Sequence, residues 1–120
     1  MQISEKLYLP CGAIIKNRFL KSAMTEGLAS ADAAANERHA NLYKAWAKGG
    51  SGISVTGNVQ VDHRYIERAG NVVIEGDQSN EQLAGLANWS AAGTQNDTHL
   101  WMQISHAGRQ TPFTINKSSV

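Results

Sequence analysis

The sequence has only one cysteine, Cys11, among its 120 residues. No intrachain disulfide can form, which is consistent with a reducing compartment, so the cytoplasm is the default location. Long hydrophobic runs are also missing, because no segment approaches the ~20 apolar residues of a membrane span. Charged Glu5 and Lys6 come before any apolar run. We therefore expect neither a secretory leader nor a membrane-spanning segment.

An excess of charge of either sign is missing as well. The 11 basic and 10 acidic residues give a formal net charge of +1, and no basic run could follow a phosphate backbone. The sequence therefore gives no reason to expect nucleic acid or an anionic membrane as a partner. It also lacks a Gly-x-Gly-x-x-Gly loop, a Walker loop and any Cys, His, Asp or Glu cluster at metal-ligand spacing. Rossmann, nucleoside-triphosphate and metal sites are thus unsupported.

The N-terminal residues contain a pattern typical of a turn, followed by a pattern typical of a strand. Residues 7–15 contain Pro10, which fixes φ, and Gly12, which tolerates a positive φ, so we expect a hairpin. Residues 18–24 follow as a candidate strand. Lys21 is unexpected there, because an interior amine needs a partner or a shifted pKa. The sequence does not identify that partner.

Two helices are predicted from capping residues and apolar periodicity. Asn36 can cap the first helix, and Gly49 and Gly50 end it. Its packing face is expected to contain His39, Leu42, Tyr43, Trp46 and Ala47. Ser79 can cap the second helix, which ends before residues 96–97. The buried face of this helix is expected to contain Leu83, Leu86, Ala87 and Ala91.

Two more strands complete the pattern. Residues 51–59 are rich in β-branched side chains, and residues 100–105 read as a short buried strand that leads into a polar loop. In the latter, alternation places Leu100, Met102 and Ile104 on one face and Trp101, Gln103 and Ser105 on the other. Residues 62–77 are expected to be a loop with an apolar interruption at 71–74. The order hairpin, β, α, β, α, β predicts an α/β fold with a parallel sheet and right-handed crossovers.

Three segments in this order, residues 16–27, 53–59 and 99–110, resemble strand-end sequences of the old yellow enzyme family. Members of this family are FMN-dependent NAD(P)H:flavin oxidoreductases and ene-reductases, and the resemblance implies a (β/α)8 TIM barrel. A complete barrel needs about 250 residues. We therefore expect residues 1–120 to be the N-terminal fragment of one FMN-binding TIM-barrel domain, with the hairpin, the first three strands and two helices, cut in the loop after the third strand.

The resemblance also implies a set of cofactor-binding residues. Gln103 would bind the pyrimidine edge of FMN, and Thr25 would lie beside the N5/O4 edge, at the end of a segment that runs along the flavin. Gly57 would let the backbone approach the ring. The complete implied set is Ser22, Ala23, Met24, Thr25, Gly57 and Gln103. The residues alone leave other roles open: a glutamine paired with neighbouring backbone, a threonine that caps a turn, and a glycine that marks a bulge.

The implied reaction is reduction of FMN by NADH or NADPH, followed by hydride transfer to a small-molecule activated alkene. The family's substrate-binding and proton-donating residues lie on later strands, so no catalytic residue is assigned in this chain. His106 is expected to anchor its loop, and Arg109 receives no role. Gly27 stands where some relatives have a substrate-contacting tyrosine, so substrate preference cannot be transferred.

Two alternatives remain for the function. The first alternative to the oxidoreductase is a truncated, inactive product or pseudoenzyme that binds no flavin. The second is an unrelated small α/β binding module. The natural alkene, the choice between NADH and NADPH, and assembly as a homo-oligomer stay open.

Overall fold

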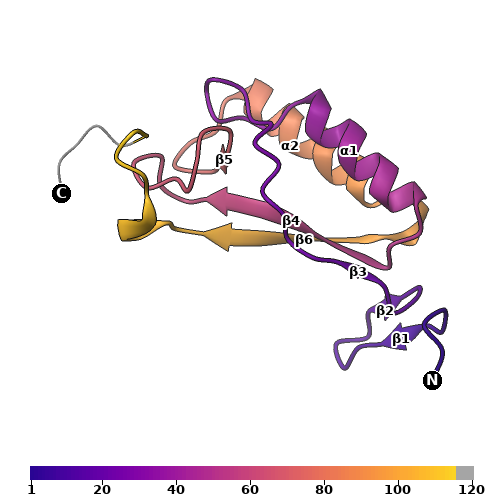
Figure 1. Cartoon of the computed structure of the whole chain (residues 1–120). Helices are drawn as coiled ribbons and strands as arrows, with labels where there is room; N and C mark the ends of the chain where they lie inside the picture. The colour runs from indigo at the N-terminus through magenta and orange to yellow at the C-terminus, as the bar shows by residue number, and fades with distance from the viewer. Residues whose placement is uncertain (116–120) are drawn as a thin grey trace.

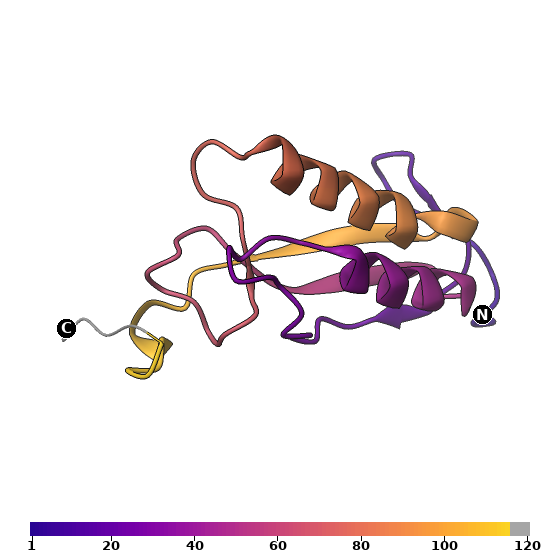
Figure 2. The ribbon, with the colours of Figure 1, turned by 90° about the horizontal axis from the view of Figure 1, so that it is seen from above.

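A parallel sheet covered on one face by two helices forms the body of the molecule (Figures 1 and 2). The computed structural model describes residues 1–115. The sheet contains β3 (Leu20–Lys21), β4 (Ile53–Gln60), β5 (Val72–Val73) and β6 (His99–Ser105). The covering helices are α1 (Glu37–Lys48) and α2 (Asn80–Gly93), and neither is long and apolar enough to cross a membrane.

Strand β4 organises the sheet, because β3, β5 and β6 all pair with it in parallel. The predicted hairpin is confirmed: β1 (Leu7–Tyr8) and β2 (Ile14–Ile15) pair antiparallel, with Gly12 at φ +88° in the turn. Figure 1 shows the hairpin beyond the amino ends of the sheet strands, whereas β4 and β6 point toward the other end. Short 3-10 turns, η1 (Gln95–Asp97) and η2 (Gly108–Gln110), flank β6.

Local capping fixes where both helices begin, as the sequence predicted. The Asn36 side chain accepts a hydrogen bond from the Arg38 amide at 3.0 Å, and His39 Nδ1 accepts one from the Asn36 amide at 3.2 Å. Ser79 and Gln82 form the same reciprocal arrangement at α2. Each pair satisfies amide groups that the first helical turn would otherwise leave without partners.

The core between helices and sheet is built on aromatic rings. Tyr43 is fully buried and Trp89 is 3% exposed, with ring centroids 5.3 Å apart in an edge-on arrangement. Trp46 lies 4.9 Å from Tyr43, and His39 lies 4.9 Å from Trp89. The predicted packing face of α1 is therefore confirmed, with His39, Tyr43 and Ala47 buried.

The partner of Lys21, which the sequence left open, is an aromatic pair. Its Nζ lies 4.2 Å from the ring centroid of Trp46 and 5.3 Å from that of Tyr43. Burial lowers the pKa of Lys21, and the nearby Glu26 carboxylate opposes that shift. The lysine is thus accommodated through cation–π contacts with the same rings that form the core.

The predicted buried face of α2 is wrong except at Leu86, which packs against the core. Leu83, Ala87 and Ala91 are exposed and Leu86 is half-buried, whereas Trp89, Ala92 and Gly93 are buried. The reason lies at Gly85, where a Cβ would stand 2.2 Å from the Ala35 carbonyl oxygen. The helix approaches its neighbour through this glycine and the large Trp89 ring, so size complementarity rather than the leucine and alanine spacing sets its rotation.

Three strand predictions also need correction. The strand expected at residues 18–24 is limited to Leu20–Lys21, and the apolar interruption at 71–74 contains an additional strand, β5. Strand β6 is not buried, since Trp101 is 45% and Ile104 is 70% exposed. Among residues 1–115 it pairs only with β4, which leaves β6 as a sheet edge.

Stability should fall as the pH drops through the histidine range. Burial lowers the pKa of His39, Arg38 acts in the same direction, and Glu26 opposes them. Because the unfolded state binds a proton more readily, the stabilisation is present above the unfolded pKa of about 6.5 and is lost as the pH falls below it. Urea unfolding at pH 7.5 and 5.5 should show this loss. His39→Gln keeps a capping acceptor and should reduce the change in the free energy of unfolding between the two pH values. An equal change in the parent and in His39→Gln would contradict the role of His39 in this pH dependence.

Candidate functional site

The three strands that carry the predicted site residues lie side by side and run in the same direction. Leu20 and Lys21 of β3 pair with Ile53 and Ser54 of β4, and Gln103 of β6 is in register with Asn58 of β4. Ser22 directly follows β3. The expected parallel arrangement of the three adjacent strands is therefore confirmed. Of the residues expected at the strand ends, Ser22 follows the end of β3, whereas Gly57 and Gln103 lie three and two positions before the ends of β4 and β6. The shared direction of the strands places the candidate site toward the carboxyl ends, where parallel α/β barrels bind ligands.

A chain of hydrogen bonds joins Thr25 to Gln103 across these strand ends. Gln103 Nε2 donates to Asn58 Oδ1 at 2.6 Å, and Asn58 Nδ2 donates to Glu67 Oε2 at 2.7 Å. Thr25 Oγ1 donates to the same Glu67 oxygen at 2.9 Å. Thr25, Asn58 and Glu67 are half-buried, whereas Gln103 is exposed. Two predicted site residues that are 78 positions apart in the sequence thus share one polar network.

The centre of this network is an ionised carboxylate. Burial acts to raise the pKa of Glu67, but the hydrogen bonds from Asn58 and Thr25, together with Arg68, more than compensate and hold this pKa below its usual value. Arg68 Nη2 lies 3.2 Å from Glu67 Oε1. Glu67 therefore accepts hydrogen bonds at neutral pH and cannot donate one.

The segment before Thr25 is accessible. Ser22 and Met24 are exposed and Ala23 is half-buried. Within residues 1–115, the side chains of these three residues form no hydrogen bond. Strand β6 presents Trp101 two positions before Gln103, on the face shared by the two residues, and this side chain is 45% exposed. The site therefore combines accessible apolar groups with the polar network.

Gly57 has a structural role that the sequence did not predict. A Cβ at this position would lie 2.4 Å from the Met24 carbonyl oxygen and 2.4 Å from Glu26 Oε2. The Gly57 amide donates to Glu26 Oε1 and to the Tyr43 hydroxyl, each at 3.2 Å. The strand register also shifts between Val55 and Asn58, which is the bulge left open as an alternative. The glycine makes room for the chain itself, so that the Met24–Glu26 segment lies directly against β4.

Gly57→Ala should therefore destabilise the protein in the absence of any flavin. The added methyl group must displace the Met24 carbonyl, and overpacking of this kind costs about 1–3 kcal/mol. Urea unfolding without FMN measures the loss. Gly49→Ala, where the nearest atom would be 3.2 Å away, is the control and should lose less. A Gly57→Ala variant as stable as the parent would refute the proposed packing role.

Asn58 and Glu67 are site residues that the sequence patterns did not predict. Asn58 carried a weak signal, since it is a polar residue near the end of a β-branched-rich strand. Glu67 carried none, because it lies in the loop between β4 and β5 and reaches the site only through the path of that loop. His106 has the expected anchoring role: its Nδ1 accepts from the Gly108 amide at 3.1 Å, and its ring lies 5.0 Å from that of Tyr65.

The same loop region brings together a group that sequence spacing did not predict. Ligand atoms of Asp62, His63 and Glu75 all lie within 4.8 Å of one another. His63 Nδ1 already contacts Glu75 Oε2 at 2.5 Å, and Arg64 Nη2 lies 2.7 Å from Asp62 Oδ2. Within the described residues, all three groups therefore already have partners: His63 and Glu75 contact each other, and Asp62 pairs with Arg64.

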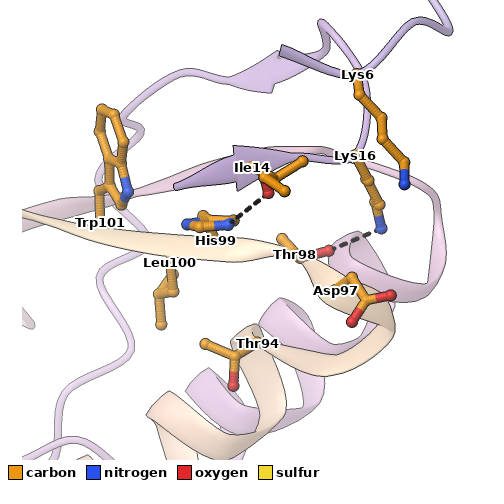
Figure 3. A pocket seen from close by; sticks show the side chains of 9 residues that line it. All are labelled: Lys6, Ile14, Lys16, Thr94, Asp97, Thr98, His99, Leu100 and Trp101. Carbon is orange, nitrogen blue, oxygen red and sulfur yellow. Dashed lines mark hydrogen bonds between the residues drawn. The ribbon is translucent and has the colours of Figure 1, made fainter. Parts of the chain in front are cut away.

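A cavity lies near the amino end of β6. It has a volume of about 550 Å³ and is bordered by the hairpin and the amino end of the strand (Figure 3). A ring nitrogen of His99 lies 3.1 Å from the Ile14 carbonyl oxygen, and Lys16 Nζ donates to Thr98 Oγ1 at 3.1 Å. These bonds, drawn in Figure 3, tie the hairpin to the sheet. Thr25, Asn58, Glu67 and Gln103 do not line this cavity, but Trp101, on the same face of β6 as Gln103, does.

Comparison with known proteins identifies relatives in sequence. No family model matches the chain. Over 114 residues it is 35% identical to the NADH-dependent flavin oxidoreductase iliE of Hypocrea jecorina, covering 94% of this chain and 28% of that protein. It is 31% identical over 121 residues to the NADH-dependent flavin oxidoreductase iccE of Talaromyces variabilis, covering all of this chain and 29% of that protein.

A solved structure shows which fold the chain has. The old yellow enzyme homologue from Zymomonas mobilis superimposes with a TM-score of 0.80 at 17% identity, covering 99% of this chain and 32% of that one. The chain thus spans less than a third of the length of each of these relatives. The expected fold, the N-terminal part of a (β/α)8 barrel, is confirmed.

Proposed function

Since the chain matches the N-terminal part of old yellow enzyme family proteins in sequence and in fold, we propose that it forms one side of the FMN site of an NAD(P)H:flavin oxidoreductase. The observation that carries this proposal is the hydrogen-bonded chain from Thr25 to Gln103 at the carboxyl ends of parallel strands. That end of a barrel is where its ligands and catalytic groups gather.

The residues present fit a flavin. The pyrimidine edge of the ring offers alternating donors and acceptors, and a carboxamide supplies both. Gln103 is exposed and uses one Nε2 hydrogen for Asn58, so its Oε1 and its second N–H can face a ligand. Thr25 keeps oxygen lone pairs, and Met24 and Trp101 are exposed apolar side chains suited to contact a ring.

Each residue then has a defined task. Gln103 binds and orients the pyrimidine edge, Thr25 meets the N5/O4 edge, and Ser22, Ala23 and Met24 run along the ring. Gly57 contributes indirectly, because it lets this segment lie against β4. FMN, when bound, supplies the chemistry: it accepts a hydride from NADH or NADPH and passes one to an activated alkene. Location in the cytoplasm is part of the same proposal.

Gln103→Leu is expected to weaken FMN binding by about 1–3 kcal/mol, since a polar edge of the flavin loses its partner. The measurement needs a complete barrel. A chimaera in which residues 1–120 replace the matching segment of the Hypocrea jecorina protein provides one, and fluorescence titration gives the dissociation constant.

The control is Gln2→Leu, which alters an exposed glutamine before the hairpin. Figure 1 shows that hairpin beyond the amino ends of the sheet strands. Gln2→Leu should leave the affinity unchanged. Unchanged FMN affinity in Gln103→Leu would exclude the proposed contact. A folded chimaera without FMN would favour the alternative of a barrel segment that binds no flavin.

A further inference from the structure

Glu67 determines which hydrogen bonds Thr25 can form with a ligand. A threonine hydroxyl has a single proton, and an ionised carboxylate can only accept. Thr25 donates that proton to Glu67 Oε2 at 2.9 Å, and the lowered pKa of Glu67 keeps the carboxylate ionised at neutral pH. Toward a ligand, Thr25 is therefore left with lone pairs and acts as an acceptor.

The same carboxylate fixes the direction of the two amides beyond it. Because Glu67 can only accept, the group of Asn58 that faces it at 2.7 Å is the Nδ2 amine. Asn58 Oδ1 then faces Gln103 and accepts from Nε2 at 2.6 Å. One negative charge thus sets the orientation of both carboxamides, and the Gln103 oxygen is turned away from Asn58.

The geometry points to Glu67 and Asn58 as positioning residues that act on a ligand through Thr25 and Gln103. This inference rests on the proposed function. A reduced flavin carries an N–H at N5 and can donate to Thr25, whereas the oxidised ring has only a lone pair there. The network therefore favours the reduced flavin over the oxidised one.

Two substitutions separate the hydrogen bond from the charge. Glu67→Gln removes the charge but keeps an oxygen that can accept from Thr25 and Asn58. Glu67→Ala removes both and frees the Thr25 hydroxyl to donate to a ligand. NMR of the 120-residue chain follows the side-chain amides of Asn58 and Gln103 without flavin. Anaerobic titration of the chimaera, with and without each substitution, against oxidised and reduced FMN gives the affinity ratio.

We expect the chimaera and its Glu67→Gln variant to bind reduced FMN about three- to tenfold more tightly than oxidised FMN, as one hydrogen bond provides. Glu67→Ala should lose that preference and shift both amide signals. Amide signals and affinity ratios that are equal in all three proteins would overturn the inference and leave the proposed function intact. Absence of FMN binding in every protein, with shifted amides in Glu67→Ala, would overturn the proposed function instead, and with it the role of this network toward a flavin.

Discussion

Tyr43→Ala is expected to lower the free energy of unfolding by about 3–5 kcal/mol, the range for truncation of a large buried ring. Tyr43 is fully buried and touches Trp46 and Trp89. Its hydroxyl donates to Glu26 and accepts from the Gly57 amide. Burial and the bond to Glu26 raise the pKa of Tyr43, so the hydroxyl keeps its proton at neutral pH. Urea unfolding measures the loss.

Tyr43→Phe is the matched control, because it keeps the ring and removes only the hydroxyl. It should cost about 1–3 kcal/mol, since the Glu26 carboxylate loses a buried donor. If Tyr43→Ala were no less stable than Tyr43→Phe, the aromatic cluster would not be the centre of the core. The outcome bears on the candidate site as well, because Tyr43 and Glu26 both accept hydrogen bonds from the Gly57 amide of β4. Gly57 directly precedes Asn58 of the Thr25–Gln103 network.

Gly85→Val is expected to cost about 3 kcal/mol, at the upper end for overpacking. A Cβ at this position would stand 2.2 Å from the Ala35 carbonyl oxygen, a backbone atom that cannot rotate away. Helix α2 would have to move off the loop before α1, which would disturb the packing of Trp89. Thermal or urea unfolding reports the loss.

Ala87→Val on the same helix is the control. Ala87 is exposed, so the change should cost only the helix propensity difference of about 0.5 kcal/mol. The opposite ranking, with Ala87→Val the more damaging, would restore the leucine and alanine face predicted from the sequence and contradict the observed rotation of the helix.

Features set by neighbouring residues were predictable from the sequence. Asn36 and Ser79 cap helices through bonds that span two or three positions, and Gly12 forms its turn within the hairpin. The strand direction followed from the alternation of strands and helices, because parallel neighbours need a crossover. For these elements, local physical chemistry and the global fold agree.

Features that depend on distant segments were not predictable. The rotation of α2 depends on the space left by Ala35, which apolar periodicity does not contain. Strand β5 is only two residues long and exists because β4 offers it a free edge. Glu67 reaches Thr25 and Asn58 only through the path of its loop. The resemblance supplied Thr25 and Gln103, and the structure added the residues that connect them.

The most direct test of the account is the FMN content of the chimaera that carries residues 1–120 in the Hypocrea jecorina relative, measured by visible absorbance after removal of free flavin. We expect close to one FMN per folded polypeptide, because in the proposed function residues 1–120 supply the pyrimidine and N5/O4 contacts of the site. A chimaera that folds cooperatively but elutes without flavin, beside a parent relative that retains it, would contradict the claim that this chain forms part of a flavin site.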